Sequence, residues 1–233
     1  MKTIIILFSL TIISLFAQSQ GSQPVVLISG KVVNERTMEP LEARVIWELL
    51  SDGTEAGIAR TDPTTGEYKI ILPFGKNYGY MALAEGFYSV TKNLDVTNLN
   101  EYKEIDEQNL FMAPIKESQV VRINNLFFKK KTAELLPESN PELARFVEFL
   151  KTNKKITIEI AGHTDNKGEP ADNLTLSQSQ AQAVANYCIS KGIKADRIVV
   201  KGYGQTQPIG FNEDEDGRAM NRRIEFKVLN TGK

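Results

Sequence analysis

The stretch ITIEIAGHTD, residues 156–165, decides how the C-terminal half of this 233-residue chain folds. Its isoleucines alternate with polar residues, which is the two-residue period of a strand with one buried face. The run ends in the carboxylate of Asp165. A second alternating segment, NRRIEFKV at residues 221–228, begins with Arg222 and Arg223. A carboxylate at a strand end and guanidiniums at a strand start, in one small domain, suit a zwitterionic ligand such as an amino acid.

The patterns around these two segments predict an α/β domain over residues 120–230. Polar and apolar residues alternate in the strand-like segments, and apolar residues recur at helical spacing between them. Asn140 is expected to cap the first helix, with Pro141 at its first position. The predicted order is βαβαββ, with a strand formed by Val121, Ile123 and residues 126–128, a helix from residue 140, a strand at 156–162, a helix at 173–191, and strands at 198–201 and 224–228.

The second predicted helix carries the residues that indicate a pocket. Asn173 and Gln180 project close to its inward side, near the helix start. Polar side chains at the edge of a buried face, near the strand end that carries Asp165, are typical of a binding pocket. The residues expected to fill the inward side are Leu174, Ala181, Val184, Ala185 and Cys188, so that Cys188 is interpreted as an inert core thiol.

Residues 24–113 are expected to form an all-β sandwich. Short strand-like runs are separated by turn residues, as at residues 51–53 and 62–66, and helical periodicity is absent. The predicted strands are residues 25–33, 44–50, 57–60, 68–72 and 80–84.

The boundary between the two domains is predicted at residues 114–119, where the alternation is lost and a proline stands. Because this linker is short, we expect the sandwich to lie at a fairly fixed distance from the second domain.

The first 19 residues resemble a secretory signal peptide. Lys2 precedes an apolar run that is short for a bilayer span, and Ala17 and Ser19 fit the small-x-small rule for cleavage. Cleavage is expected before Gln20 or after Ala17, and an uncleaved anchor is the alternative. No cysteine follows the segment, so we expect an exported chain that has no lipid anchor and is not membrane-embedded after signal cleavage.

Composition argues against several other classes of function. Lys and Arg total 28 against 29 Asp and Glu, a net charge of −1, so no overall positive field attracts nucleic acid. One cysteine and one histidine cannot supply the usual ligands of a zinc site. We expect no nucleic-acid partner, no metal and no cofactor.

The C-terminal pattern resembles the OmpA-like C-terminal domain family, the peptidoglycan-associating module of bacterial envelopes. The resemblance covers residues 120–230. The residues that carry it are Gly162, His163, Thr164, Asp165, Gly168, Asn173, Leu176, Ser177, Ala181, Gly192, Arg197, Gly202, Gly204, Pro208, Arg218, Asn221, Arg222 and Arg223.

In that family the pocket holds the diaminopimelate residue of the peptidoglycan stem peptide. The resemblance implies that Asp165 takes the ligand ammonium and that Asn173 and Arg222 add further contacts. The ligand-binding residues that it implies are Thr164, Asp165, Asn173, Leu176, Gln180 and Arg222.

One position departs from the family pattern. Gln180 stands where the family has an arginine that takes the ligand carboxylate, and an amide cannot form a bidentate charged contact. The exchange should cost about 1.5–3 kcal/mol, or roughly tenfold to a hundredfold in affinity. Three compensations are open: Arg222 moves in, a lysine among residues 129–131 supplies charge, or the ligand carboxylate is amidated.

The N-terminal pattern resembles the prealbumin-like, carboxypeptidase-regulatory-like sandwich, which implies a non-catalytic spacer or adhesion module. The residues that carry this resemblance are Thr61, Gly66, Tyr68, Ile70, Leu72, Pro73, Gly75, Tyr78, Ala84, Gly86, Phe87 and Tyr88. The aromatic residues admit a sugar-stacking interpretation or a core interpretation, and the core is the more usual place for them: Trp47, Tyr78, Tyr80, Phe87 and Tyr88.

The sequence therefore predicts a periplasmic, non-enzymatic protein that binds peptidoglycan and is peripheral to the outer membrane. Its sandwich would bind another envelope protein. One alternative is an envelope assembly protein whose OmpA-like domain has lost or altered its ligand because of Gln180. An enzyme acting on cell-wall peptides is disfavoured, because His163 lacks a nearby nucleophile and is interpreted as a hydrogen-bonding scaffold residue. The acidic run at residues 213–216 is interpreted as a solvated loop.

Overall fold

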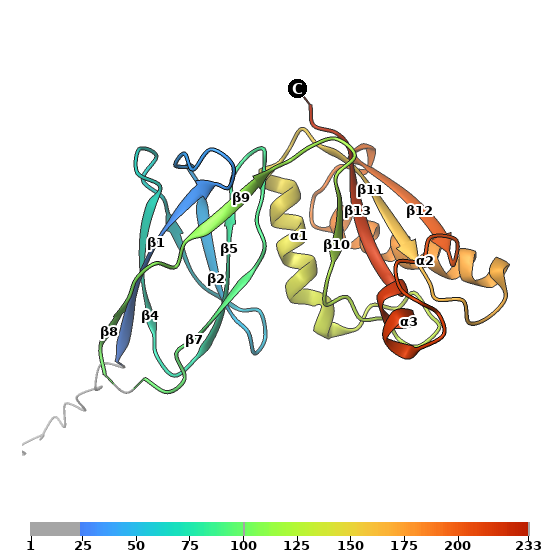
Figure 1. Ribbon diagram of the computed structural model, residues 1–233, viewed down its shortest axis with the longest axis horizontal. Helices are drawn as coiled ribbons and strands as arrows, with labels where there is room; N and C mark the ends of the chain where they lie inside the picture. Colours follow the sequence, from blue (N-terminus) through green and yellow to red (C-terminus); the bar gives the residue numbers. More distant parts are fainter. Residues whose placement is uncertain (1–23, 100, 233) are drawn as a thin grey trace, which may run out of the picture.

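The computed structural model describes residues 24–99 and 101–232 (Figure 1). The signal peptide predicted at residues 1–19 lies outside these residues. Within the described ranges, no helix combines the length and the apolar character needed to cross a bilayer.

The N-terminal part, residues 24–114, consists of two sheets that share one core. Alternation explains why one face of each strand is buried, as in β1, where Val26 and Ile28 are fully buried. One sheet has the order β4-β1-β9-β6, with β8 also paired to β1: Glu67–Pro73, Val25–Asn34, Leu110–Pro114, Phe87–Tyr88 and Lys103–Ile105. The other has the order β3-β2-β5-β7: Glu55–Arg60, Arg44–Leu49, Asn77–Leu83 and Lys92–Asp95.

Aromatic side chains fill the centre of this core. The indole of Trp47 stacks on the ring of Tyr80 with 4.2 Å between ring centroids, and Tyr78 meets it edge-on at 6.3 Å. All three are almost fully buried, so the core interpretation is confirmed for them. Phe87 and Tyr88 are only half-buried.

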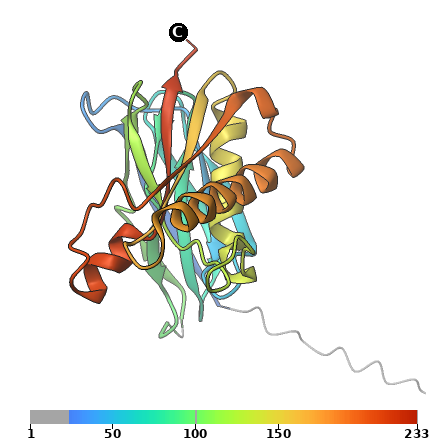
Figure 2. The same ribbon diagram turned by 90° about the vertical axis from the view of Figure 1, so that its right-hand side faces the viewer.

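The C-terminal part, residues 115–232, is a four-stranded sheet of order β10-β13-β11-β12 with helices on one face (Figures 1 and 2). β11 runs parallel to β12 and antiparallel to β13. The strands are β10 Val120–Ile123, β11 Thr157–His163, β12 Ile198–Gly204 and β13 Arg223–Asn230. The helices are α1 Asn140–Thr152, α2 Pro170–Ser190 and α3 Glu215–Asn221, with short 3₁₀ turns at Pro137–Ser139 and Ala195–Arg197.

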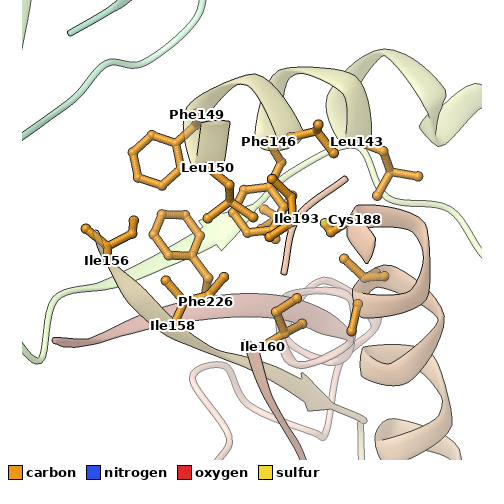
Figure 3. Close-up of a cluster of buried hydrophobic side chains, with 14 of the residues drawn as sticks. Leu143, Phe146, Phe149, Leu150, Ile156, Ile158, Ile160, Cys188, Ile193 and Phe226 are labelled. Carbon is orange, nitrogen blue, oxygen red and sulfur yellow. The ribbon is translucent and has the colours of Figure 1, made fainter. Parts of the chain in front are cut away.

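The core of this part lies between the sheet and the two long helices. Figure 3 shows Leu150 of α1 and Cys188 of α2 close to Phe226 and Ile160 of the sheet. Cys188 is fully buried, which confirms its predicted place in the core, and burial raises the pKa of its thiol to about 12.

Four predictions for this part were wrong. Asn140 was expected to cap α1, but it is the first residue of that helix, and Ser139 stands at the N-cap without a side-chain hydrogen bond. The first strand ends at Ile123, because residues 126–128 enter a loop in which the Ser139 hydroxyl bonds both the N–H and the C=O of Phe127. Leu174 was expected to fill the inward side of α2, but it is half exposed and not part of the core. The acidic run was expected to be a loop, but it begins α3, since the Asp214 side chain accepts a hydrogen bond from Gly217 N at 2.6 Å as an N-cap.

The segment between the two parts is tied to both of them. Ile115 N donates to Gly86 O at 2.8 Å in the N-terminal part, and its side chain belongs to the C-terminal core. Ser118 N donates to Val228 O at 2.8 Å, and Val228 N donates to Gln119 O at 2.9 Å. Residues 115–119 therefore follow a fixed path instead of a free one.

Side chains from the two parts also pack directly against each other across the junction. The ring of Tyr88 meets those of Phe149 and Phe226 edge-on, at centroid distances of 5.8 and 6.2 Å. The Asn153 side chain accepts a hydrogen bond from Gly86 N at 2.7 Å. Figure 1 shows α1 between β5 of the N-terminal part and the C-terminal sheet. The aromatic contacts of the junction are thus continuous with the second core.

A buried ionic cluster sits at the same junction. Arg145 of α1 donates from Nε to Glu48 Oε1 of β2 at 2.5 Å and from Nη1 to Glu142 Oε2 at 2.7 Å. Burial opposes the charge on Arg145, but the two carboxylates outweigh it and raise the pKa of the guanidinium. Burial also raises the pKa of Glu142, against the effect of Arg145. The cluster is stable only while the arginine is present.

Replacing Arg145 with Met should therefore destabilise the protein by about 3–5 kcal/mol, because it leaves two buried carboxylates without a cation. Chemical denaturation followed by the fluorescence of Trp47, the single tryptophan, measures this change. Lys31→Gln is the control, since the Lys31–Glu67 pair is more than half exposed and its loss should change stability by less than about 1 kcal/mol. Equal effects of the two substitutions would contradict the account of the junction.

Candidate ligand-binding groove

A groove of about 1080 Å³ opens where β11 ends and α2 begins. Its walls come from the loop after β10, the end of β11, the first turns of α2, α3 and the start of β13. The structure brings all six sequence-predicted residues to this groove: Thr164, Asp165, Asn173, Leu176, Gln180 and Arg222.

Two glycines allow α2 to lie close enough to the sheet to form one wall. A Cβ on Gly162 of β11 would collide with the carbonyl oxygen of Ser177, and one on Gly202 of β12 would lie 2.5 Å from Gln178 N. The Ser177 hydroxyl accepts a hydrogen bond from Gly204 N at 2.9 Å, which fixes the helix to the end of β12. Any larger residue at these glycines would move α2 away from the strand end.

Asp165 lies at the base of the groove and is only 7% exposed. Its Oδ1 accepts from Lys167 N at 2.9 Å, and its Oδ2 accepts from Arg222 Nη1 at 2.6 Å. Thr164 holds the backbone at this point, since its N–H donates to Gly204 O and its hydroxyl donates to Asp165 O, both at 2.9 Å. A carboxylate has about four acceptor positions. Asp165 therefore retains capacity for a ligand donor.

Arg222 joins Asp165 to a second carboxylate. Its Nη2 donates to Glu215 Oε1 of α3 at 2.7 Å, and the hydrogen bond to Asp165 is the main cause that raises the pKa of the guanidinium. Hydrogen bonds from Arg222 and then Arg218 lower the pKa of Glu215 to about 2. Since the Arg222 side chain is 45% exposed, it can still contact a ligand from the groove.

Asn173 and Leu176 form the α2 side of the groove. Asn173 Nδ2 donates to Asp165 O at 3.3 Å and to Gln205 Oε1 at 2.7 Å, so this buried amide fixes the loop after the strand. Leu176 is half-buried and supplies an apolar surface.

Gln180 has a partner that its sequence position did not indicate. Its Nε2 donates to the backbone oxygen of Thr132 at 2.9 Å, which connects α2 to the loop after β10. That loop is closed by hydrogen bonds from Lys129 N to Glu134 O and from Thr132 N to Lys129 O. Gln180 therefore holds the segment that carries Lys129, Lys130 and Lys131, all of which line the groove.

The groove also has residues that the sequence analysis did not predict. Arg122, Asn124, Lys167, Asp172 and Glu215 line it. Glu215 belongs to the acidic run at residues 213–216, which was predicted to be a loop. Its place in the groove follows from α3, and the sequence analysis did not predict that helix. The segment from Arg122 to Asn125 also lines a cavity of about 290 Å³ at the junction, so one short segment separates the groove from the N-terminal part.

Asn221, although part of the predicted motif, does not reach the groove. It is fully buried, and its Oδ1 accepts from Ile209 N at 2.7 Å and from Gly210 N at 2.9 Å. Its Nδ2 donates to Gly210 O and Asn212 Oδ1, both at 2.9 Å. Its role is to hold the segment before α3 in place, and thereby to fix Arg222 next to it.

His163 is buried in the wall of the groove. It was predicted to be a hydrogen-bonding scaffold residue, but neither of its ring nitrogens has a hydrogen-bond partner among the described residues. Its ring stacks on Tyr203 with 5.2 Å between centroids, and its Nε2 lies 3.4 Å from Glu225 Oε2, while Arg223 binds Glu225 at 2.6 Å. The pKa of His163 is lowered to about 4, mainly by burial and next by the positive charge of Arg223. The imidazole is therefore neutral at pH 7. The described residues contain no group of three or more His, Cys, Asp or Glu placed to hold a metal ion.

A family model matches the part of the chain that forms most of the groove. The model described as "OmpA family" matches residues 127–222. The peptidoglycan-binding protein ArfA of Mycobacterium tuberculosis H37Rv is 37% identical over 101 residues, which is 43% of this chain and 31% of ArfA. The probable lipoprotein YiaD of Escherichia coli K12 is 36% identical over 105 residues, 45% of this chain and 48% of YiaD. This chain thus spans less than half the length of these two curated relatives.

Solved structures that are similar to this chain also match less than half of it. The cell wall anchor of the T6SS from Pseudomonas aeruginosa is 32% identical, with a TM-score of 0.42, and the match covers 47% of this chain and 78% of that one.

The buried imidazole predicts a specific pH dependence of stability. The unfolded chain takes up a proton at an ordinary histidine pKa near 6.5, whereas folded His163 does so only near 4. Between these values the unfolded state binds more protons, so the contribution of His163 to the free energy of unfolding falls as the pH drops below 6.5, by roughly 3 kcal/mol in total. Above pH 6.5 this contribution is constant.

His163 is the single histidine of the chain, so its replacement isolates the effect. His163→Phe keeps a flat ring against Tyr203 and should remove the slope between pH 5 and pH 6.5, as measured by urea denaturation. A slope of equal size in both proteins would assign it to other groups.

Proposed function

Because residues 127–222 form an OmpA family domain, we propose that this chain binds peptidoglycan in the bacterial cell envelope non-covalently, through the diaminopimelate-containing stem peptide. The observation that carries the proposal is the pair of opposite charges in one groove, Asp165 and Arg222, flanked by polar and apolar side chains from α2. The binding of ArfA to peptidoglycan, stated in its name, supports the same function for the groove.

The chemistry of the groove fits a zwitterionic ligand. Diaminopimelate within a stem peptide offers a free ammonium and carboxylates close together. The ammonium would donate to the unused acceptor positions of Asp165, while Arg222 and the amide of Asn173 lie next to it. Because Asp165 is almost buried, a charged contact there is screened less than one on an open surface.

The N-terminal part supports a linking role in this proposal. We take residues 24–113 to be a β-sandwich domain, joined by residues 114–119, that binds another envelope protein. The aromatic contacts of the junction and the tied linker hold it against the peptidoglycan-binding domain. A partner on the sandwich would then lie at a fixed distance from the wall. We propose a periplasmic location, peripheral to the outer membrane, and no enzymatic activity.

One observation favours the alternative of an altered or lost ligand. Gln180 is occupied by the Thr132 carbonyl, and Asp165 is already paired with Arg222. In that case the domain would be an envelope assembly module, and its polar groups in the groove would bind each other instead of a ligand.

Sedimentation with insoluble peptidoglycan tests the proposed function. The wild-type chain should pellet with it, and Asp165→Asn should weaken binding roughly tenfold to a hundredfold, because it removes the charge but keeps the shape. Asp196→Asn, at an exposed position before β12, is the matched control and should bind like wild type.

A wild-type chain that stays in the supernatant would contradict the proposal. If Gln180→Arg then pelleted, the alternative would be supported, since the single missing guanidinium would explain the lost binding.

A further inference from the structure

Positive charge is concentrated around the groove, although the whole chain has a net charge of −1. The cationic side chains that line the groove outnumber its carboxylates. The cations are Arg122, Lys129, Lys130, Lys131, Lys167, Arg222 and Arg223, and the carboxylates are Asp165, Asp172 and Glu215.

Several of these cations have no carboxylate partner. Lys129 pairs with Glu134 at 3.3 Å, and the two arginines before and in β13 pair with Asp165, Glu215 and Glu225. Among the residues that the structure describes, the remaining four form no ion pair: Arg122, Lys130, Lys131 and Lys167. A ligand with one ammonium and one carboxylate would use Asp165 and one cation, which leaves the others unmatched.

The loop with Lys130 and Lys131 has a fixed backbone. Lys131 has a φ of 60°, a left-handed conformation that non-glycine residues adopt only when their surroundings hold it. The next residue, Thr132, accepts the hydrogen bond from Gln180, and its hydroxyl donates to Lys129 O at 2.9 Å. The two lysines are therefore presented at the groove by a loop that α2 anchors.

We propose that the groove selects stem peptides whose diaminopimelate side-chain carboxylate is free over those in which it is amidated, and that Lys130 and Lys131 contact this carboxylate, which Asp165 and Arg222 do not serve. Gln180 acts as a positioning residue that holds their loop. This inference rests on the proposed function and adds its specificity. Two of the compensations considered for the neutral Gln180 were a lysine among residues 129–131 and an amidated ligand carboxylate. This inference favours the lysines.

Two peptides that differ in one group test the selectivity. Isothermal titration of the full chain would compare L-alanyl-γ-D-glutamyl-meso-diaminopimelate with the same peptide amidated on the side-chain carboxylate of diaminopimelate. The free acid should bind roughly tenfold to a hundredfold more tightly, and added salt should reduce the difference. Equal binding, or tighter binding of the amide, would overturn this inference and leave the proposed function intact. Failure of both peptides to bind would overturn the proposed function itself.

A lysine substitution then locates the selectivity. The double variant Lys130→Gln/Lys131→Gln should bind the free acid roughly tenfold to a hundredfold more weakly and should no longer distinguish the two peptides. Lys154→Gln/Lys155→Gln is the matched control, because this exposed pair lies in the turn before β11, at the opposite end of that strand. A retained preference in the groove variant would assign the selectivity to other residues.

The positioning role of Gln180 is tested through the lysines. Gln180→Ala should lose the same preference, and adding the two lysine substitutions to it should cause little further loss, since both changes act on one contact. Amide hydrogen exchange in residues 129–134 should also become faster in Gln180→Ala. Additive losses with unchanged exchange would mean that Gln180 does not act through the loop.

Discussion

The close packing of α2 on β11 and β12 is the constraint on which the groove depends. Gly162 and Gly202 leave no room for a side chain against the backbone of Ser177 and Gln178, so the helix lies directly over the strand ends. This position puts Asn173 against Asp165 and lets Gln180 reach the loop after β10. The groove is thus built on packed elements, and hydrogen bonds from Asn173 and Gln180 of α2 hold its loops.

The charged side chains of the groove are held in place on this packed scaffold. Asp165 is nearly buried and paired with Arg222, which Glu215 holds from the other side, while the fully buried Asn221 fixes the backbone just before Arg222. The loop after β10 brings Lys130 and Lys131 to the same groove, and no carboxylate among the described residues pairs with them. The groove therefore has one carboxylate at a fixed position, Asp165, and an excess of cationic side chains. The chain as a whole is nearly neutral.

Alternating polar and apolar residues were sufficient to predict most strands, and apolar residues at helical spacing were sufficient to predict both long helices. Each of these elements has one buried face that repeats with a regular period. They failed where local hydrogen bonds override apolar character, as for Phe127, whose backbone is satisfied by the Ser139 hydroxyl instead of a strand. The family pattern identified six residues that all line one groove. The hydrogen bond between Gln180 and Thr132 could not be predicted in this way, because the two residues lie 48 positions apart in the sequence and meet only in the fold. The junction ion cluster was hidden for the same reason.

A crystal structure of the full chain with a diaminopimelate-containing tripeptide tests the central claim most directly. We predict that the ligand ammonium lies within hydrogen-bond distance of Asp165, and that a carboxylate of the same ligand faces Lys130 or Lys131, with Gln180 still bonded to Thr132. A ligand bound outside the groove, or one whose ammonium is directed away from Asp165, would contradict the account.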